Sequence, residues 1–154
     1  MRRVPISAGL LTLTLFTIPA GCGGNRNVDL TPIEPIDFSS AVAAEVRNAQ
    51  GQAVLSGRFA VLDTTDEDTE RKAPLTATAV DPDATGEAEV EVSGSGDDRR
   101  QEVEFNIANV EPRAVFTFVI DGRVVATATA NDRGQAEMER SVPLPAGSLG
   151  GNRR

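Results

Sequence analysis

The sequence predicts an all-β fold, an antiparallel β-sandwich or barrel-like domain of about eight strands. The first observation is that apolar residues recur at a period of two over most of residues 39–142. The second is that short segments with glycine or asparagine, typical of tight turns, separate these runs. No segment of this region shows a convincing helical period.

The first predicted strands cover residues 39–47, 52–62 and 75–80. Between the second and third strands, the acidic run at 63–72 breaks the alternation, and we expect an exposed loop there. The next strand lies within "GEAEVEVSG". Its apolar residues alternate with Glu87, Glu89 and Glu91, so these carboxylates should point outward.

The remaining strands follow in "RQEVEFNIANV", "RAVFTFVIDG" and "RVVATATA", and at residues 135–142. The second of these is apolar on both faces, which is typical of a central strand covered on both sides. Its end, Asp121 and Gly122, predicts a hairpin. We expect Phe105, on the preceding strand, to neighbour Phe118 across the sheet.

An internal repeat supports this layout. Residues 39–56 align without gaps on residues 122–139, with six identities in 18 positions that include Asn48 with Asn131 and Gly51 with Gly134. The pattern predicts a strand, a turn whose glycine takes a positive φ, and a returning strand. The segment "PDATGEAEV" is expected to repeat the turn and its glycine, Gly86, a third time.

The two ends of the chain differ in composition from this region. Two arginines, an apolar stretch and small residues before Cys22 predict a signal peptide at residues 1–21. Residues 22–38 carry two prolines and few apolar residues, which predicts a flexible tether, and residues 143–154 have the composition of a disordered tail. The folded domain is therefore expected at residues 39–142.

The sequence "PAGC" at the end of the signal peptide resembles the lipobox of bacterial lipoproteins, although Pro19 stands where the family prefers leucine. The resemblance implies cleavage before Cys22 and acylation of its sulfur and new amino group, which would anchor the chain to a membrane. Gly23 is not the aspartate that the family associates with inner-membrane retention. The resemblance therefore favours the outer membrane, facing either the periplasm or the exterior. A plain secretion signal is the alternative.

Composition excludes several function classes. Two of the fifteen Lys and Arg precede Cys22 and all twenty-three Asp and Glu follow it, so the formal charge from Cys22 onward is −10, which disfavours a nucleic-acid partner. The chain has no histidine and a single cysteine, which excludes Ser-His-Asp and Cys-His catalysis and the usual zinc sites. Trp and Tyr are absent, which weakens a carbohydrate site. We therefore expect no enzyme activity.

Two acidic segments carry a metal hypothesis. The run at 63–70 has enough oxygen ligands, Asp63, Asp66, Glu67, Asp68 and Glu70, but its sequence fixes no geometry, and a solvated loop is the favoured interpretation. Asp81, Asp83 and Thr85, followed by Gly86, resemble the opening of a calcium-binding loop. The twelfth position of that loop is Val92 instead of a bidentate glutamate. An Asp-rich turn is the competing interpretation, and no cofactor other than Ca²⁺ is expected.

These observations predict a non-enzymatic lipoprotein of the bacterial cell envelope that serves as a structural or protein-interaction module, with an envelope protein as its partner. The alternative is an extracytoplasmic protein that binds Ca²⁺ or a small ligand.

Overall fold

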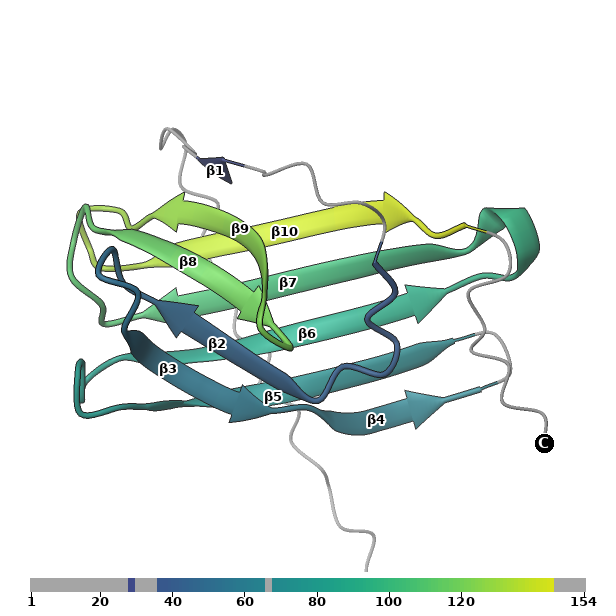
Figure 1. The fold of residues 1–154 in the computed structure, drawn as a ribbon, viewed down its shortest axis with the longest axis horizontal. Coiled ribbons are helices and arrows are strands. Elements are labelled where there is room, and N and C mark those ends of the chain that lie inside the picture. The colour runs from purple at the N-terminus through teal and green to yellow at the C-terminus, as the bar shows by residue number, and fades with distance from the viewer. Residues whose placement is uncertain (1–27, 30–35, 66–67, 146–154) are drawn as a thin grey trace, which may run out of the picture.

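A computed structural model describes residues 28–29, 36–65 and 68–145 and shows an all-β, barrel-like molecule (Figure 1). Its strands are β1 (Val28–Asp29), β2 (Ala43–Arg47), β3 (Ala53–Arg58), β4 (Ala60–Thr64), β5 (Thr69–Ala77), β6 (Thr85–Ser93), β7 (Arg100–Ala108), β8 (Val115–Ile120), β9 (Arg123–Thr129) and β10 (Ala136–Pro143). A single 3₁₀ turn, η1 (Gly96–Asp98), lies between β6 and β7. Within the described ranges, no helix is long and apolar enough to cross a membrane. The all-β prediction is confirmed.

The strands form one antiparallel sheet in the order β1-β9-β8-β2-β3-β5-β6-β7-β10, and β4 pairs with the first half of β5. The sheet folds over, so that β9, β8, β2 and β3 cross in front of β10, β7, β6 and β5 (Figure 1). β9 and β10 also contact each other, which nearly closes the barrel. In this arrangement the sheet can bury one face along its whole length.

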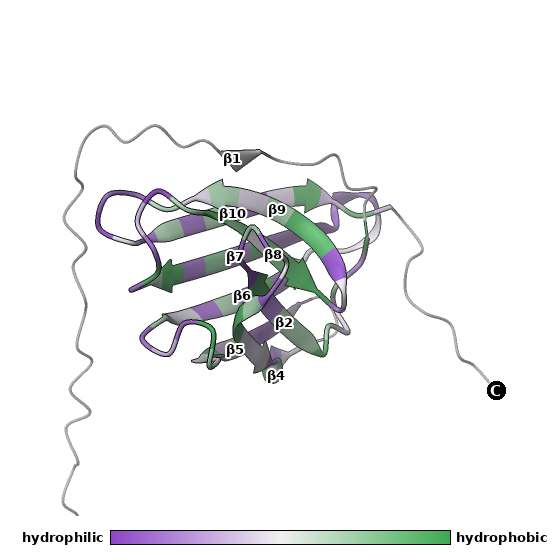
Figure 2. Ribbon diagram, turned by 60° about the vertical axis from the view of Figure 1, so that its left-hand side comes forward, coloured by the Kyte–Doolittle hydropathy of each residue, from purple (hydrophilic) through white to green (hydrophobic). Residues whose placement is uncertain are grey.

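The core lies between the two layers and follows the period of two in the sequence (Figure 2). Phe105 on β7 and Phe118 on β8 are fully buried, with ring centroids 5.0 Å apart and planes tilted by 45°. The prediction that they are neighbours is confirmed, but the rings do not meet in the way predicted. β7 and β8 do not pair, so the rings meet across the core and not across one sheet.

Several strand boundaries differ from the predicted ones. The segment 52–62 is two strands, because the pairing with β2 ends at Arg58 and the chain pairs with β5 from Ala60 onward. The prediction of an exposed loop at 63–72 is wrong. Both ends of that run are strand, in β4 and β5.

The prediction that "RAVFTFVIDG" forms a central strand covered on both sides is confirmed in part. β8 lies between β2 and β9, and Val119 is buried, whereas Val115 at the start of the strand is exposed.

The turns of the internal repeat are built alike. Asn48 Oδ1 accepts hydrogen bonds from the backbone N–H of Gln50 and Gln52, at 3.1 and 2.9 Å. Asn131 Oδ1 accepts the equivalent bonds from Arg133 and Gln135, at 2.9 and 3.1 Å. The two repeats differ after the turn. In the first repeat, β3 pairs with β2, the strand before the turn. In the second, β10 pairs with β7 and not with β9, the strand before the turn.

The third copy of this turn is not formed. Gly86 lies inside β6 and does not have a positive φ. It is required there for space. A Cβ at this position would lie 2.7 Å from the carbonyl oxygen of Asn106 on the adjoining strand and 3.0 Å from the Ile107 side chain.

The segment before β2 closes one end of the barrel, and we call residues 36–41 the strap. Phe38 is buried in the core, one residue before the predicted start of the domain. The Phe38 N–H donates to Gln101 Oε1 at 2.6 Å, and Gln101 Nε2 donates to the Ile36 carbonyl at 3.0 Å. At the other end of the chain, Leu144 is also buried, two residues beyond the predicted end.

Candidate functional site

The outward side of β5, β6, β7 and β10 carries the densest charge of the described residues. Hydrophobic and hydrophilic residues alternate along these strands (Figure 2). This alternation turns their buried residues toward the core and their acidic neighbours outward. The outward positions include two basic residues, Lys72 and Arg100. We call the following eight glutamates the acidic face: Glu70, Glu87, Glu89, Glu91, Glu102, Glu104, Glu137 and Glu139.

The strand register places six of these eight carboxylates directly opposite another one, whereas Glu87 and Glu137 both lie opposite Asn106. Glu89 pairs with Glu104, which pairs in turn with Glu139, so one row crosses three strands. In the next row, Glu91 pairs with Glu102. Like charges at directly opposite positions of a sheet are destabilising. The sheet therefore folds against an electrostatic cost along this face.

The repulsion between these carboxylates affects the pKa of Glu102. Partial burial raises the pKa of its carboxyl, and the charges of Glu139, Glu91, Glu104 and Glu89 raise it further. Glu102 therefore holds its negative charge less readily than an isolated glutamate would.

Lys72 offsets part of this charge. Its Nζ lies 3.3 Å from a carboxylate oxygen of Glu87 and 3.3 Å from one of Glu89. Burial alone would lower the pKa of Lys72, but hydrogen bonds and charge interactions with the two glutamates raise it. The single lysine of the chain thus stays charged and bridges two members of the acidic face.

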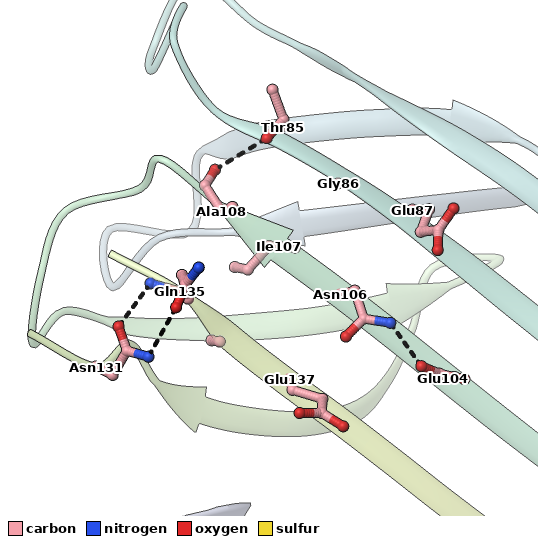
Figure 3. Close-up of a pocket in the computed structure, with 11 residues that line it drawn as sticks. Thr85, Gly86, Glu87, Glu104, Asn106, Ile107, Ala108, Asn131, Gln135 and Glu137 are labelled. Carbon is pink, nitrogen blue, oxygen red and sulfur yellow. Dashed lines mark hydrogen bonds between the residues drawn. The ribbon is translucent and has the colours of Figure 1, made fainter. Parts of the chain in front are cut away.

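A groove of about 610 Å³ lies against β6, β7 and β10, at the end of the barrel where the turn of residues 131–135 is found. Its polar lining includes Glu87, Glu104 and Glu137, which Figure 3 shows beside Asn106. Asn106 Nδ2 donates to Glu104 Oε1 at 2.5 Å and fixes that carboxylate. Gly86, which has no side chain, also lines the groove.

Ionised carboxylates only accept hydrogen bonds, so this groove suits a cationic group such as an ammonium or a guanidinium. Within the described part of the chain, no three acidic, histidine or cysteine side chains converge in a way that could hold a metal ion. An array of carboxylates of this kind would attract positively charged groups.

The structure places the predicted calcium residues in and after the turn between β5 and β6. Asp81 begins a tight turn in which the Ala84 N–H donates to the Asp81 carbonyl at 3.3 Å, and Asp83 is exposed. Thr85 Oγ1 donates to the Ala108 carbonyl at 3.5 Å. Thr85 also lines the groove, whereas Asp81 and Asp83 do not.

The predicted lipidation site, Cys22, and the signal peptide lie outside the described residues. Nothing in the fold therefore bears on either of them.

The sequence predicts part of the acidic face. The alternation in residues 86–94 places Glu87, Glu89 and Glu91 outward, as predicted. The alignment of these residues with Glu102, Glu104 and Glu139 depends on strand register, which the alternation does not specify. The groove could not be predicted from any local sequence pattern, because its lining comes from three strands and a turn.

Comparison of the chain with protein-family models, curated proteins and solved structures finds no significant match.

Proposed function

We propose that this protein is a non-enzymatic interaction module of the bacterial cell envelope, anchored by lipid at Cys22, whose acidic face binds a positively charged protein partner. The observation that carries the proposal is the row of glutamates in register across β6, β7 and β10. A cationic partner would neutralise this row and remove the repulsion that folding leaves in place. The groove gives such a partner a place for a lysine or arginine side chain.

Binding can be tested with the full chain and a fluorescent peptide rich in lysine and arginine. We expect affinity to fall steeply with ionic strength, because the attraction is between exposed charges. Changing Glu87, Glu104 and Glu137 to glutamine together should weaken binding at least about tenfold. Unchanged affinity in this triple variant would refute the assignment of the face.

A matched control removes three acidic charges elsewhere, by changing Asp81, Asp83 and Asp97 to asparagine. If the peptide binds only through net charge, this control should lose as much affinity as the first variant. The proposal requires that it lose much less. The same pair of variants can be compared in a pull-down from envelope extracts to identify the natural partner.

The anchor has its own test. Cys22→Ser should abolish labelling by radioactive fatty acid and leave the protein unprocessed or released from the membrane fraction. Labelling and fractionation that do not change in this variant would refute the lipid anchor, while leaving the acidic face untouched as a proposal.

The calcium alternative makes a distinct prediction. A specific site at Asp81, Asp83 and Thr85 should raise the melting temperature at millimolar or lower Ca²⁺, with little effect of Mg²⁺. The control variant with Asp81→Asn and Asp83→Asn would lose this shift.

A further inference from the structure

A second pocket, of about 270 Å³, lies at the opposite end of the barrel from the acidic groove. It is enclosed by the strap, by the ends of β4 and β5, and by the loop between β6 and β7, near η1 in Figure 1. Among the described residues, its lining includes no Asp or Glu but has two arginines, Arg71 and Arg99. The chain has a net charge of −8, yet the charged side chains in the described lining of this pocket are both cations.

Arg71 is the central feature of this pocket. Strand alternation turns it to the same side of β5 as the buried Ala73, toward the inside of the barrel. Its Nε donates to the Ser39 carbonyl at 2.5 Å and its Nη1 to the Ala41 carbonyl at 3.4 Å. Among the described residues it forms no ion pair with a carboxylate. A guanidinium has five N–H donors, so two backbone carbonyls leave both its charge and part of its donor capacity unmatched.

Arg99 is held in a fixed position. Its Nη1 lies 2.9 Å from Asp37 Oδ2 in an ion pair whose side chains are only 12% and 15% exposed. This pair fixes the strap against the end of β7. Asp68, just before β5, accepts a hydrogen bond from the Gly94 N–H at 3.3 Å.

Hydroxyl groups complete the lining. Ser39, Thr64, Thr69 and Ser95 all border the pocket and can donate to an anion. Gly94 and Gly96, on either side of Ser95, have φ of +81° and +59° and add no side chain of their own to the lining. Guanidinium and hydroxyl donors converging on a small space are the chemistry that proteins use for oxyanions.

We propose that this pocket binds a small ligand through an oxyanion group, a phosphate, sulfate or carboxylate, with Arg71 and the surrounding hydroxyls as its donors. The site is independent of the proposed function, because it lies at the other end of the barrel and requires the opposite ligand charge.

The test is calorimetric titration of the full chain with sodium phosphate, sodium sulfate and sodium acetate, each at the same ionic strength set with sodium chloride. Saturable binding of at least one anion is expected, and the order of affinities identifies the class of oxyanion. Arg71→Gln should weaken that binding about tenfold, the value of one hydrogen bond to a charged group. Failure of all three anions to bind would overturn the proposal.

Two further variants make the result decisive. Arg133→Gln removes the same charge from an exposed turn at the far end, and equal loss of binding in this control would show a nonspecific charge effect and overturn the site. Thr69→Val removes one hydroxyl and retains the charge. If Arg71→Gln does not fold, weaker binding by Thr69→Val supports the site, and binding that it leaves unchanged overturns it.

Discussion

At the scale of single residues, the contact between Phe105 and Phe118 joins the two layers of the barrel. The chain has only six phenylalanines and no Trp or Tyr, so most of its core consists of smaller side chains. Large rings bury more apolar area than these residues do, and they should carry a disproportionate share of the stability.

Phe118→Ala is therefore expected to reduce the free energy of unfolding by about 3–5 kcal/mol, because it removes a fully buried ring and leaves a cavity beside Phe105. Denaturant melts of the full chain measure this loss. Val115→Ala on the same strand is the control, since Val115 is 46% exposed and should change stability by less than about 1 kcal/mol. A Phe118 variant as stable as the control would mean that the ring does not join the layers.

Gln101 is the buried polar side chain of the described core, and it holds the strap. Gln101→Leu leaves the Phe38 N–H and the Ile36 carbonyl without their partner and should cost about 1–3 kcal/mol. Hydrogen exchange at the Phe38 amide should become faster. Asn106→Ala, which removes an outward amide on the same strand, should leave that exchange rate unchanged.

Sequence reasoning succeeded for the apolar residues at this scale and failed for the polar residues whose partners are distant in the sequence. Phe105, Phe116 and Phe118 lie where their alternation places them, because each strand needs only a local pattern to choose its buried side. Gln101 and Asp121 could not be found in this way. Gln101 binds a residue 63 positions away, and Asp121 Oδ1 accepts a hydrogen bond from the Ala43 N–H, 78 positions away, at 2.8 Å.

At the scale of elements, the repeated turn provides an internal comparison. Gly51 and Gly134 occupy the same position in the two turns, with φ of +77° and +69°. Their surroundings differ. A Cβ on Gly51 would meet nothing within 4 Å, whereas a Cβ on Gly134 would overlap the carbonyl oxygen of Val110.

Gly51→Ala should thus cost only the strain of a left-handed alanine, about 1–2 kcal/mol. Gly134→Ala should cost a further 1–3 kcal/mol or so, because the backbone at Val110 must also move. Melting both variants side by side measures the difference. Equal losses would show that the backbone at Val110 yields without cost.

The turn of this repeat was predictable and the path of its second strand was not. Asparagine and glycine act through hydrogen bonds within five residues, so their signal is local. Whether the returning strand pairs with its neighbour or joins another layer depends on the rest of the barrel. β5 was missed at its start for a related reason, since its inward residues there, Thr69 and Arg71, are polar and border the second pocket instead of the core.

At the scale of the whole molecule, the described structure separates its charges. The acidic face covers the outer side of four strands, and the pocket with Arg71 and Arg99 lies at one end of the same strands. The sequence predicts the net charge and the outward direction of several glutamates. It does not predict this separation, which arises only when strand register aligns residues from distant segments.

The charge of the acidic face should make stability depend on pH. The pKa of Glu102 is raised in the folded state above its ordinary value of 4.5, so the folded protein takes up this proton before the unfolded chain does. Stability then rises as the pH falls from the raised pKa toward 4.5, and the gain is complete below that value. Repulsion from Glu139, Glu91, Glu104 and Glu89 is fully present at neutral pH.

Glu102→Gln isolates this effect, because it removes the charge and retains the shape. At pH 7 and low salt the variant should be more stable than the wild type, by no more than about 1 kcal/mol for so exposed a group. The difference should shrink as the pH is lowered toward 4.5, because protonation then neutralises the wild-type carboxyl, and it should also shrink in 0.5 M sodium chloride, which screens the face. Glu111→Gln, in the loop between β7 and β8, removes an equal charge away from the face and should show neither dependence. Unfolding curves for the three proteins across pH 4.5–7 provide the measurement. A variant that is less stable than the wild type at pH 7 would mean that Glu102 is stabilised by its neighbours, and that the acidic face does not store the repulsion a cationic partner would relieve.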